Sequence, residues 1–314
     1  MKLKEKFAKD IIKERLKNIP EELHPKDNIC IAGGFALSVY MDTLCIDSKE
    51  DVSKKYVVNH LDPFLRSEGS TYYSDIDYFR IGDGDKTTLD SIFSEECSES
   101  INLKNGKLVF IRNSEHANTF HYESRYFSSL IQGVTYKYDS IEDMFSSFDL
   151  SISCVAIVGD KLVFSEEFEN SMKNKALSIV NKKFFSEENK ILHLMYQANR
   201  VAKYLERFGR SKDDVRTIMR MSDELSKVIY DLILKTEEFD LEYWKKDNNA
   251  FYDHYGRKRG ETQSDLSRVY MLFSNNISTF LRGMSSNSSA APFLIGSKNL
   301  TIQDQSKRFI LKAK

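Results

Sequence analysis

The chain has 314 residues, of which 41% are hydrophobic and 30% charged, so it is long enough to bury one or two cores. Its formal net charge of -1 lacks the basic excess that is typical of nucleic-acid-binding proteins. No apolar run approaches the roughly 20 residues that a membrane span needs, and Met1 to Lys6 carry no signal-peptide core. We therefore expect a cytoplasmic protein with no membrane partner. The four cysteines have no CxxC spacing, which favours buried thiols over a zinc or disulfide site.

The first seventeen residues predict an amphipathic helix. Lysine and arginine side chains would form its solvated face, and its apolar side would consist of Leu3, Phe7, Ile11, Ile12 and Leu16. Pro20 and Pro25 then mark a loop into a strand at 28–32.

That strand runs into a two-glycine turn and a helix from Phe35 to about Leu44. Gly33 and Gly34 have no Cβ, so backbone amides there can approach a ligand closely. The positive end of the following helix favours an anion at the same place, and phosphate is the obvious anion.

A later strand carries two acids that flank one apolar residue, in the order Asp75, Ile76, Asp77. Alternate side chains of a strand share a face, so the two carboxylates point the same way and Ile76 points into the core. Like charges held this close repel unless a cation lies between them. A hard dication such as Mg²⁺ is the natural occupant. A phosphate cradle beside such a metal site is typical of phosphoryl or nucleotidyl transfer.

Asp149 is the candidate third acid. It begins the apolar and β-branched run at 150–158, where a buried acid needs a partner. It could hold a metal or take the proton from an attacking hydroxyl. The alternative is an ordinary turn residue at the start of that run.

The order Gly-Gly, Asp-x-Asp and a lone later Asp resembles the DNA polymerase β-like nucleotidyltransferase superfamily over roughly residues 28–160. The similarity is strongest to compact GG-x-A-L versions in phage-encoded proteins and in abortive-infection and toxin nucleotidyltransferases. The resemblance implies that Gly33 and Gly34 hold an NTP triphosphate with help from Ser38. It also implies that Asp75 and Asp77 ligate two Mg²⁺ ions, and that Asp149 joins the catalytic metal and orients or deprotonates the acceptor.

Two features set this sequence apart from the pattern it resembles. About forty residues separate Gly34 from Asp75, so we expect an insertion at 45–70. Asp77 is followed by Tyr78 and Phe79 and not by the arginine pair of CCA-adding tRNA enzymes, which disfavours standard CCA addition.

The expected architecture is an α/β (α+β) nucleotidyltransferase catalytic domain with a mixed sheet at 1–182, followed by an all-α domain at 183–314. A serine- and asparagine-rich stretch predicts flexibility at 283–300. A hairpin is expected to turn at Gly159 and Asp160.

The second half begins with a helix predicted from about Ser186 to Gly209. Its basic residues Arg200, Lys203 and Arg207 fall three and four apart and share much of one face. If the helix packs across the cleft, Lys203 and Arg207 would bind the nucleotide. The alternative is a solvated basic face.

Taken together, the residues and the resemblance predict a Mg²⁺-dependent enzyme that moves an NMP from an NTP to a hydroxyl acceptor. The basic helix face favours RNA, most of all a tRNA 3′ end, as the acceptor. Two alternatives stay open. The acceptor could be a protein or small molecule in a toxin or counter-defence role, in the host cytoplasm if the protein is phage-encoded. The chain could also be an inactive nucleotidyltransferase-like binding module.

Overall fold

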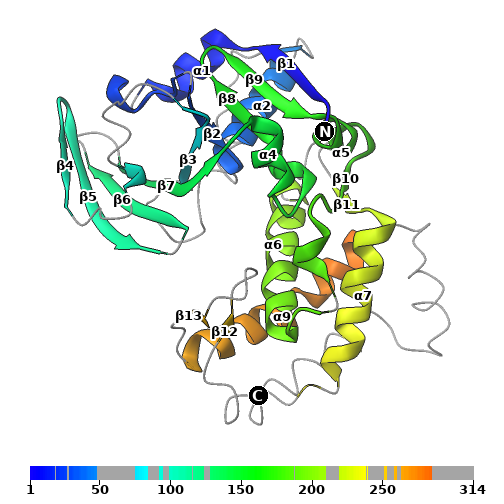
Figure 1. Ribbon diagram of the computed structural model, residues 1–314. Helices are drawn as coiled ribbons and strands as arrows, with labels where there is room; N and C mark the ends of the chain where they lie inside the picture. The colour runs from blue at the N-terminus through cyan, green and yellow to red at the C-terminus, as the bar shows by residue number, and fades with distance from the viewer. Residues whose placement is uncertain are drawn as a thin grey trace. The chain divides into compact units, whose positions relative to one another are not determined.

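Figure 1 presents the protein as a computed structural model. The structure describes residues 1–17, 19–26, 28–47, 75–83, 92–94, 99–114, 116–123, 128–186, 188–209, 219–237, 239, 251–252, 258–259 and 263–284. The chain divides into two compact units, 1–169 and 170–314. The expected boundary at 182 lies further along the chain. Most of the expected insertion at 45–70, and all of 283–300 beyond residue 284, fall outside the described residues.

The first unit contains a mixed sheet whose strand order, among the described residues, is β1-β9-β8-β2-β3-β7-β6-β5-β4. Neighbouring strands are antiparallel except β3 and β7, which are parallel. The strands are β1 (Leu3–Phe7), β2 (Ile29–Ala32), β3 (Ile76–Ile81), β4 (Ile101–Leu103), β5 (Gly106–Asn113), β6 (Ala117–Glu123), β7 (Ser128–Tyr138), β8 (Val155–Val158) and β9 (Lys161–Ser165). This sheet confirms the α/β class and its mixed character.

Helices cover both faces of the sheet's central strands (Figure 1). Tyr40 of α2 (Gly34–Asp47) packs edge-on against Phe164 of β9, with ring centroids 5.4 Å apart. On the opposite face Met144 of α4 (Ile141–Ser146) lies over Cys30 of β2, with 3.8 Å between the sulfur atoms. The helices of this unit are α1 (Lys9–Leu16), α2 (Gly34–Asp47) and α4 (Ile141–Ser146), and α5 (Glu166–Asn174) begins in it. The centre of the sheet is therefore a buried layer between helices.

Strand β3 separates two environments by simple alternation. Ile76 and Tyr78 are fully buried on the α1 and α2 face, where the Tyr78 hydroxyl donates to the Leu23 carbonyl over 2.8 Å. Asp77 and Phe79 face the other way, and both Asp75 and Asp77 are half-buried. The structure thus has the alternation that the Asp-Ile-Asp pattern predicts.

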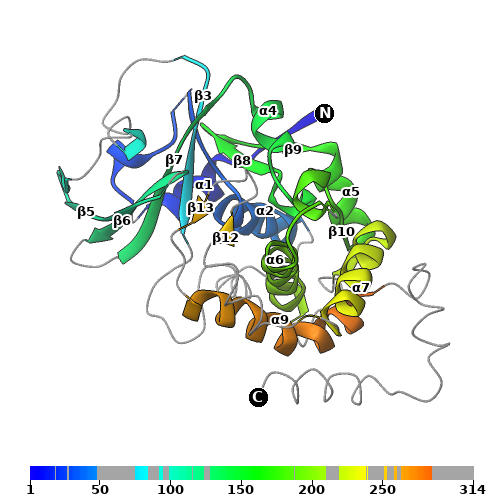
Figure 2. The same cartoon turned by 60° about the horizontal axis from the view of Figure 1, so that its bottom comes forward.

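The second unit is mostly helical. Its helices are α6 (Ile191–Gly209), α7 (Asp223–Glu237) and α9 (Gln263–Gly283), which Figure 2 shows from below. Asn199 of α6 donates to the Val269 carbonyl of α9 and accepts from Asn276, each over 3.1 Å. Two short ladders also occur, which an all-α domain would not contain. They are β10 (Ala176–Leu177) with β11 (Arg220–Met221), and β12 (Phe251–Tyr252) with β13 (Lys258–Arg259).

Two expected elements are wrong. Residues 3–7 form the edge strand β1 against β9, and only Lys9–Leu16 is helical. Phe7, assigned to a buried helix face, is 69% exposed. The strand expected at 150–158 starts later, because Ser151–Ser153 forms a short 3₁₀ turn before β8. No helix in the part of the chain that the structure describes combines the length and apolar character needed to cross a membrane.

Candidate functional site

The turn after β2 depends on a glycine. Gly33 has φ +73°, the left-handed region that side-chain-bearing residues avoid, and α2 starts at the next residue. The Gly33 amide donates to the Val155 carbonyl of β8 over 3.3 Å, and its carbonyl accepts from Leu37 over 2.9 Å. The turn is therefore anchored to the sheet on one side and to the first helical turn on the other.

This turn lies beside the acid pair. Ala32, the last residue of β2, pairs directly with Asp77 of β3. A Cβ placed on Gly33 would lie 3.6 Å from the Asp77 Oδ2 atom. Two sequence motifs that are about forty residues apart thus meet at one corner of the sheet, with the helix α2 N-terminus next to a carboxylate.

The second carboxylate has an amide partner that sequence reasoning missed. Gln132 of β7 donates from Nε2 to Asp75 Oδ2 over 2.9 Å, and Gln132 is also the register partner of Asp77. Gln132 is half-buried. A signal was present in the sequence, because Gln132 is the one strongly polar residue in the stretch 130–134.

Asp149 is buried, at 4% exposure, and its Oδ1 accepts from the Leu150 amide over 2.9 Å. The preceding residue, Phe148, packs on Phe79 with ring centroids 5.4 Å apart, on the face of β3 that carries Asp77. The segment that carries Asp149 thus packs on the same face of β3 as Asp77, as a shared site would require. Among the described residues, however, no three His, Cys, Asp or Glu side chains gather in a way that would hold a metal ion. The role of Asp149 as a third metal ligand stays a prediction.

The two buried cysteines of this unit are poor nucleophiles. Burial raises the pKa of the Cys30 thiol to about 12. Burial also raises the pKa of Cys154, and the negative charge of Asp149 raises it further. Because the thiolate is the reactive form, both thiols are unreactive at neutral pH, as expected for core cysteines.

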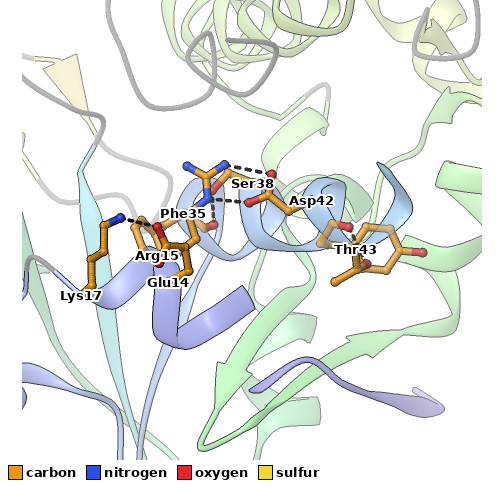
Figure 3. Close-up of polar contacts among 8 residues, drawn as sticks. Glu14, Arg15, Lys17, Phe35, Ser38, Asp42 and Thr43 are labelled. Atoms are coloured by element: carbon orange, nitrogen blue, oxygen red, sulfur yellow. Dashed lines mark hydrogen bonds and ion pairs between the residues drawn. The ribbon is translucent and has the colours of Figure 1, made fainter. Parts of the chain in front are cut away.

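Helix α2 is held against α1 by an ion pair, shown in Figure 3. Arg15 Nη2 donates to Asp42 Oδ1 over 3.0 Å, and Arg15 Nε donates to Asp42 Oδ2. Burial raises the pKa of Asp42, and the Arg15 guanidinium opposes this shift without cancelling it. The pair fixes helix α2, whose N-terminus lies where Gly33 and Gly34 meet Asp77. We call this place the glycine corner.

The other predicted nucleotide-binding residues lie elsewhere. Ser38 is fully buried in α2, and its hydroxyl donates to the Phe35 carbonyl over 2.7 Å, so that its proton serves the helix (Figure 3). Lys203 is an exposed residue of α6 in the second unit. Arg207 belongs to the same helix, and its side chain is outside the described residues. Their roles in binding a nucleotide stay predictions.

The grouped residues suit a hard dication. Asp75 and Asp77 supply carboxylate oxygens, the donors that Mg²⁺ prefers. The missing side chain of Gly33 leaves open the space beside Asp77 Oδ2 that a Cβ would fill. A helix N-terminus next to that space favours a phosphate. The donor set and the cradle therefore fit a metal together with a phosphate ligand.

Comparison with known proteins adds the family. A family model described as Gad2, Gabija anti-defense 2 family protein, matches residues 2–175, more than half of the chain. The chain belongs to the Gabija anti-defense 2 family. The match covers the whole first unit, including the glycine corner and all three acids. No curated protein matches the chain.

Proposed function

We propose that this Gabija anti-defense 2 family member is a Mg²⁺-dependent nucleotidyltransferase that acts against the Gabija defence. One observation carries the proposal. The left-handed Gly33 turn places the start of α2 directly beside Asp77 of β3, and Asp75 immediately precedes that strand. The matched region contains this whole arrangement, which ties the proposed chemistry to the part of the chain that defines the family.

In the proposed reaction, backbone amides of the first turn of α2, which starts at Gly34, bind the β- and γ-phosphates of an NTP, aided by the positive end of that helix. The Gly33 amide already donates to the Val155 carbonyl, so Gly33 contributes the space left by its missing side chain. Asp75 and Asp77 hold Mg²⁺, which when bound neutralises phosphate charge. An acceptor hydroxyl oxygen forms a bond to the α-phosphorus, and the bond from that phosphorus to the bridging oxygen breaks. Pyrophosphate leaves, and the hydroxyl proton passes to a carboxylate, for which Asp149 is the candidate.

The acceptor we propose is a component of the Gabija defence that carries a hydroxyl group. Family membership supports a counter-defence target, and the net charge of -1 does not favour a general RNA substrate. A protein side chain is the first choice, because modifying a defence protein would inactivate it directly. RNA, including a tRNA 3′ end, is the competing acceptor that the test has to separate.

The test uses the full chain, Mg²⁺, each α-labelled NTP in turn, and lysate from cells with or without the Gabija defence. We expect one NTP to label a protein that is present only in the lysate with Gabija. Asp77→Asn should abolish the label. Asp83→Asn is the matched control, since Asp83 is fully exposed near the far end of β3 and pairs with Lys137. Label in the RNA fraction would overturn the proposed acceptor, and no label from any NTP would overturn the activity.

A second candidate is a binding module without catalysis. It is favoured by the finding that no three metal-ligating side chains gather among the described residues. Such a module would bind an NTP with Mg²⁺ in calorimetry and leave it unchanged. Protection against Gabija by an Asp149→Asn variant, combined with loss of protection in Asp77→Asn, would favour this candidate over the enzyme.

A further inference from the structure

Gln132 is a half-buried polar residue between the buried residues Ile131 and Gly133. It lies on β7, the parallel neighbour of β3, and its register partner is Asp77. Its side chain turns to Asp75, with Nε2 at 2.9 Å from Oδ2. One residue of β7 thus bonds to Asp75, just before β3, and pairs in register with Asp77 within it. The glycine corner lies on the opposite side of β3, because β2 and β7 flank that strand.

We infer that Gln132 is a positioning residue that sets the orientation of Asp75 for metal binding. This inference rests on the proposed function, since it assigns Asp75 to a metal. A carboxylate that accepts from a fixed amide loses rotational freedom before the cation arrives, so less entropy is lost on binding. The hydrogen bond to a charged acceptor is also one of the stronger kinds in a protein.

The chemistry of the amide group matters as much as its place. Asp42 of α2, by contrast, is held by a guanidinium, which satisfies the carboxylate and also neutralises it. Gln132 donates a hydrogen bond to Asp75 and adds no charge, so the amide orients this carboxylate without neutralising it. A carboxylate at position 132 would repel Asp75 at this distance unless a cation lay between them. Glutamine therefore lets the site form in the absence of metal.

The first arm of the test measures Mn²⁺ binding to the full chain by calorimetry. Gln132→Met keeps the length of the side chain and removes the donor. We expect its Kd for Mn²⁺ to rise about tenfold, the size of one hydrogen bond to a charged group. A Kd within twofold of the wild-type value would overturn the inference.

The second arm guards against a merely structural effect. Gln132→Glu should melt at a lower temperature than the wild type in EDTA, because two carboxylates then adjoin. Mn²⁺ should raise its melting temperature more than that of the wild type. An equal or smaller rise would overturn the inference, since a residue that only packs the sheet gains nothing from metal.

Two further proteins separate this inference from the proposed function. Asp75→Asn should lose Mn²⁺ binding, and Asp83→Asn should keep it. If the wild type binds no Mn²⁺, or if Asp75→Asn binds as tightly as the wild type, the proposed metal site fails and the inference fails with it. If Asp75→Asn loses binding and both Gln132 variants behave like the wild type, the inference alone fails.

Discussion

The two faces of strand β3 use neighbouring residues for opposite purposes. On one face Ile76 and Tyr78 are fully buried under α1 and α2. On the other, Asp75 and Asp77 are half-buried beside a glycine turn and an amide. One side of the strand is thus bound into the core, and the other side carries charge at an accessible corner. Stability and the proposed chemistry can therefore be changed separately by substitutions one residue apart.

The same contrast appears between two carboxylates near α2. Asp42 is buried and bidentate with Arg15, so its charge is matched within the fold. Asp77 instead lies beside the Gly33 turn, where a Cβ on Gly33 would be 3.6 Å from its Oδ2 atom. We therefore expect substitutions at the Arg15–Asp42 pair to act on stability, and substitutions at Asp77 to act on the proposed ligand site.

The largest expected effect tests the accessible face. Asp77→Ala should reduce nucleotidyl transfer and protection against Gabija to background while the melting temperature stays close to that of the wild type. Removing a half-buried carboxylate leaves no large cavity, so the fold has little to lose. Transfer at the wild-type rate by this variant would show that the face of β3 with Asp77 does not carry the proposed chemistry.

The next effect tests the buried face. Tyr78→Ala should lower the free energy of unfolding by about 4 kcal/mol, because it empties a fully buried aromatic site. Tyr78→Phe should cost about 1 to 2 kcal/mol, since it only removes the donor to the Leu23 carbonyl. Urea titration measures both values, and Tyr78→Phe should retain transfer activity. A larger loss for Tyr78→Phe than for Tyr78→Ala would contradict this account.

Arg15→Met should lower the free energy of unfolding by about 3 kcal/mol, because Asp42 would remain buried without its cation. The effect depends on pH. Burial holds the pKa of Asp42 above its ordinary value of 3.8. Its contribution to stability is therefore fully present below that value and is lost as the pH rises through the higher pKa of the folded protein. The variant, without the guanidinium, should lose more stability than the wild type as the pH rises above the ordinary Asp42 pKa of 3.8, as measured by urea titrations. Equal losses would show that Arg15 does not stabilise the charged form.

The smallest expected effect comes from two glycine substitutions, which distinguish the cost of backbone strain from an effect on the candidate site. Gly33→Ala and Gly159→Ala should each cost about 1 kcal/mol, since both glycines have positive φ. A Cβ on Gly159 meets nothing within 4 Å, whereas one on Gly33 enters the space next to Asp77. Only Gly33→Ala should therefore also slow transfer, by about tenfold. Equal activity of the two variants would show that the glycine corner takes no part in the transfer reaction.

Local patterns in the sequence predicted local structure well. The strand, the glycine turn and the helix after Gly33 follow each other directly, and the structure has all three. The spacing of Leu3 and Phe7 fits both a helix and an edge strand, and pairing with β9, far along the chain, selects the strand. Such distant partners are not encoded in a short window.

The candidate site shows the same limit. Residue type and alternation were enough to place Asp75 and Asp77 on one face. Gln132 meets them only through the parallel pairing of β3 with β7. The residues around position 132 do not indicate that β3 is the neighbouring strand. Asp149 was expected at the head of a strand, whereas the 3₁₀ turn at Ser151–Ser153 intervenes before β8.

The parallel pairing of β3 with β7 has a consequence during synthesis. Both carboxylates leave the ribosome about 55 residues before Gln132 does. Until then β3 is an edge strand, with unpaired amides and carbonyls along one side. A nascent or truncated chain that ends before β7 would thus carry both acids and still lack the amide beside them. Because such non-local pairing forms slowly, placement of the Gln132 amide beside Asp75 is a late event in folding.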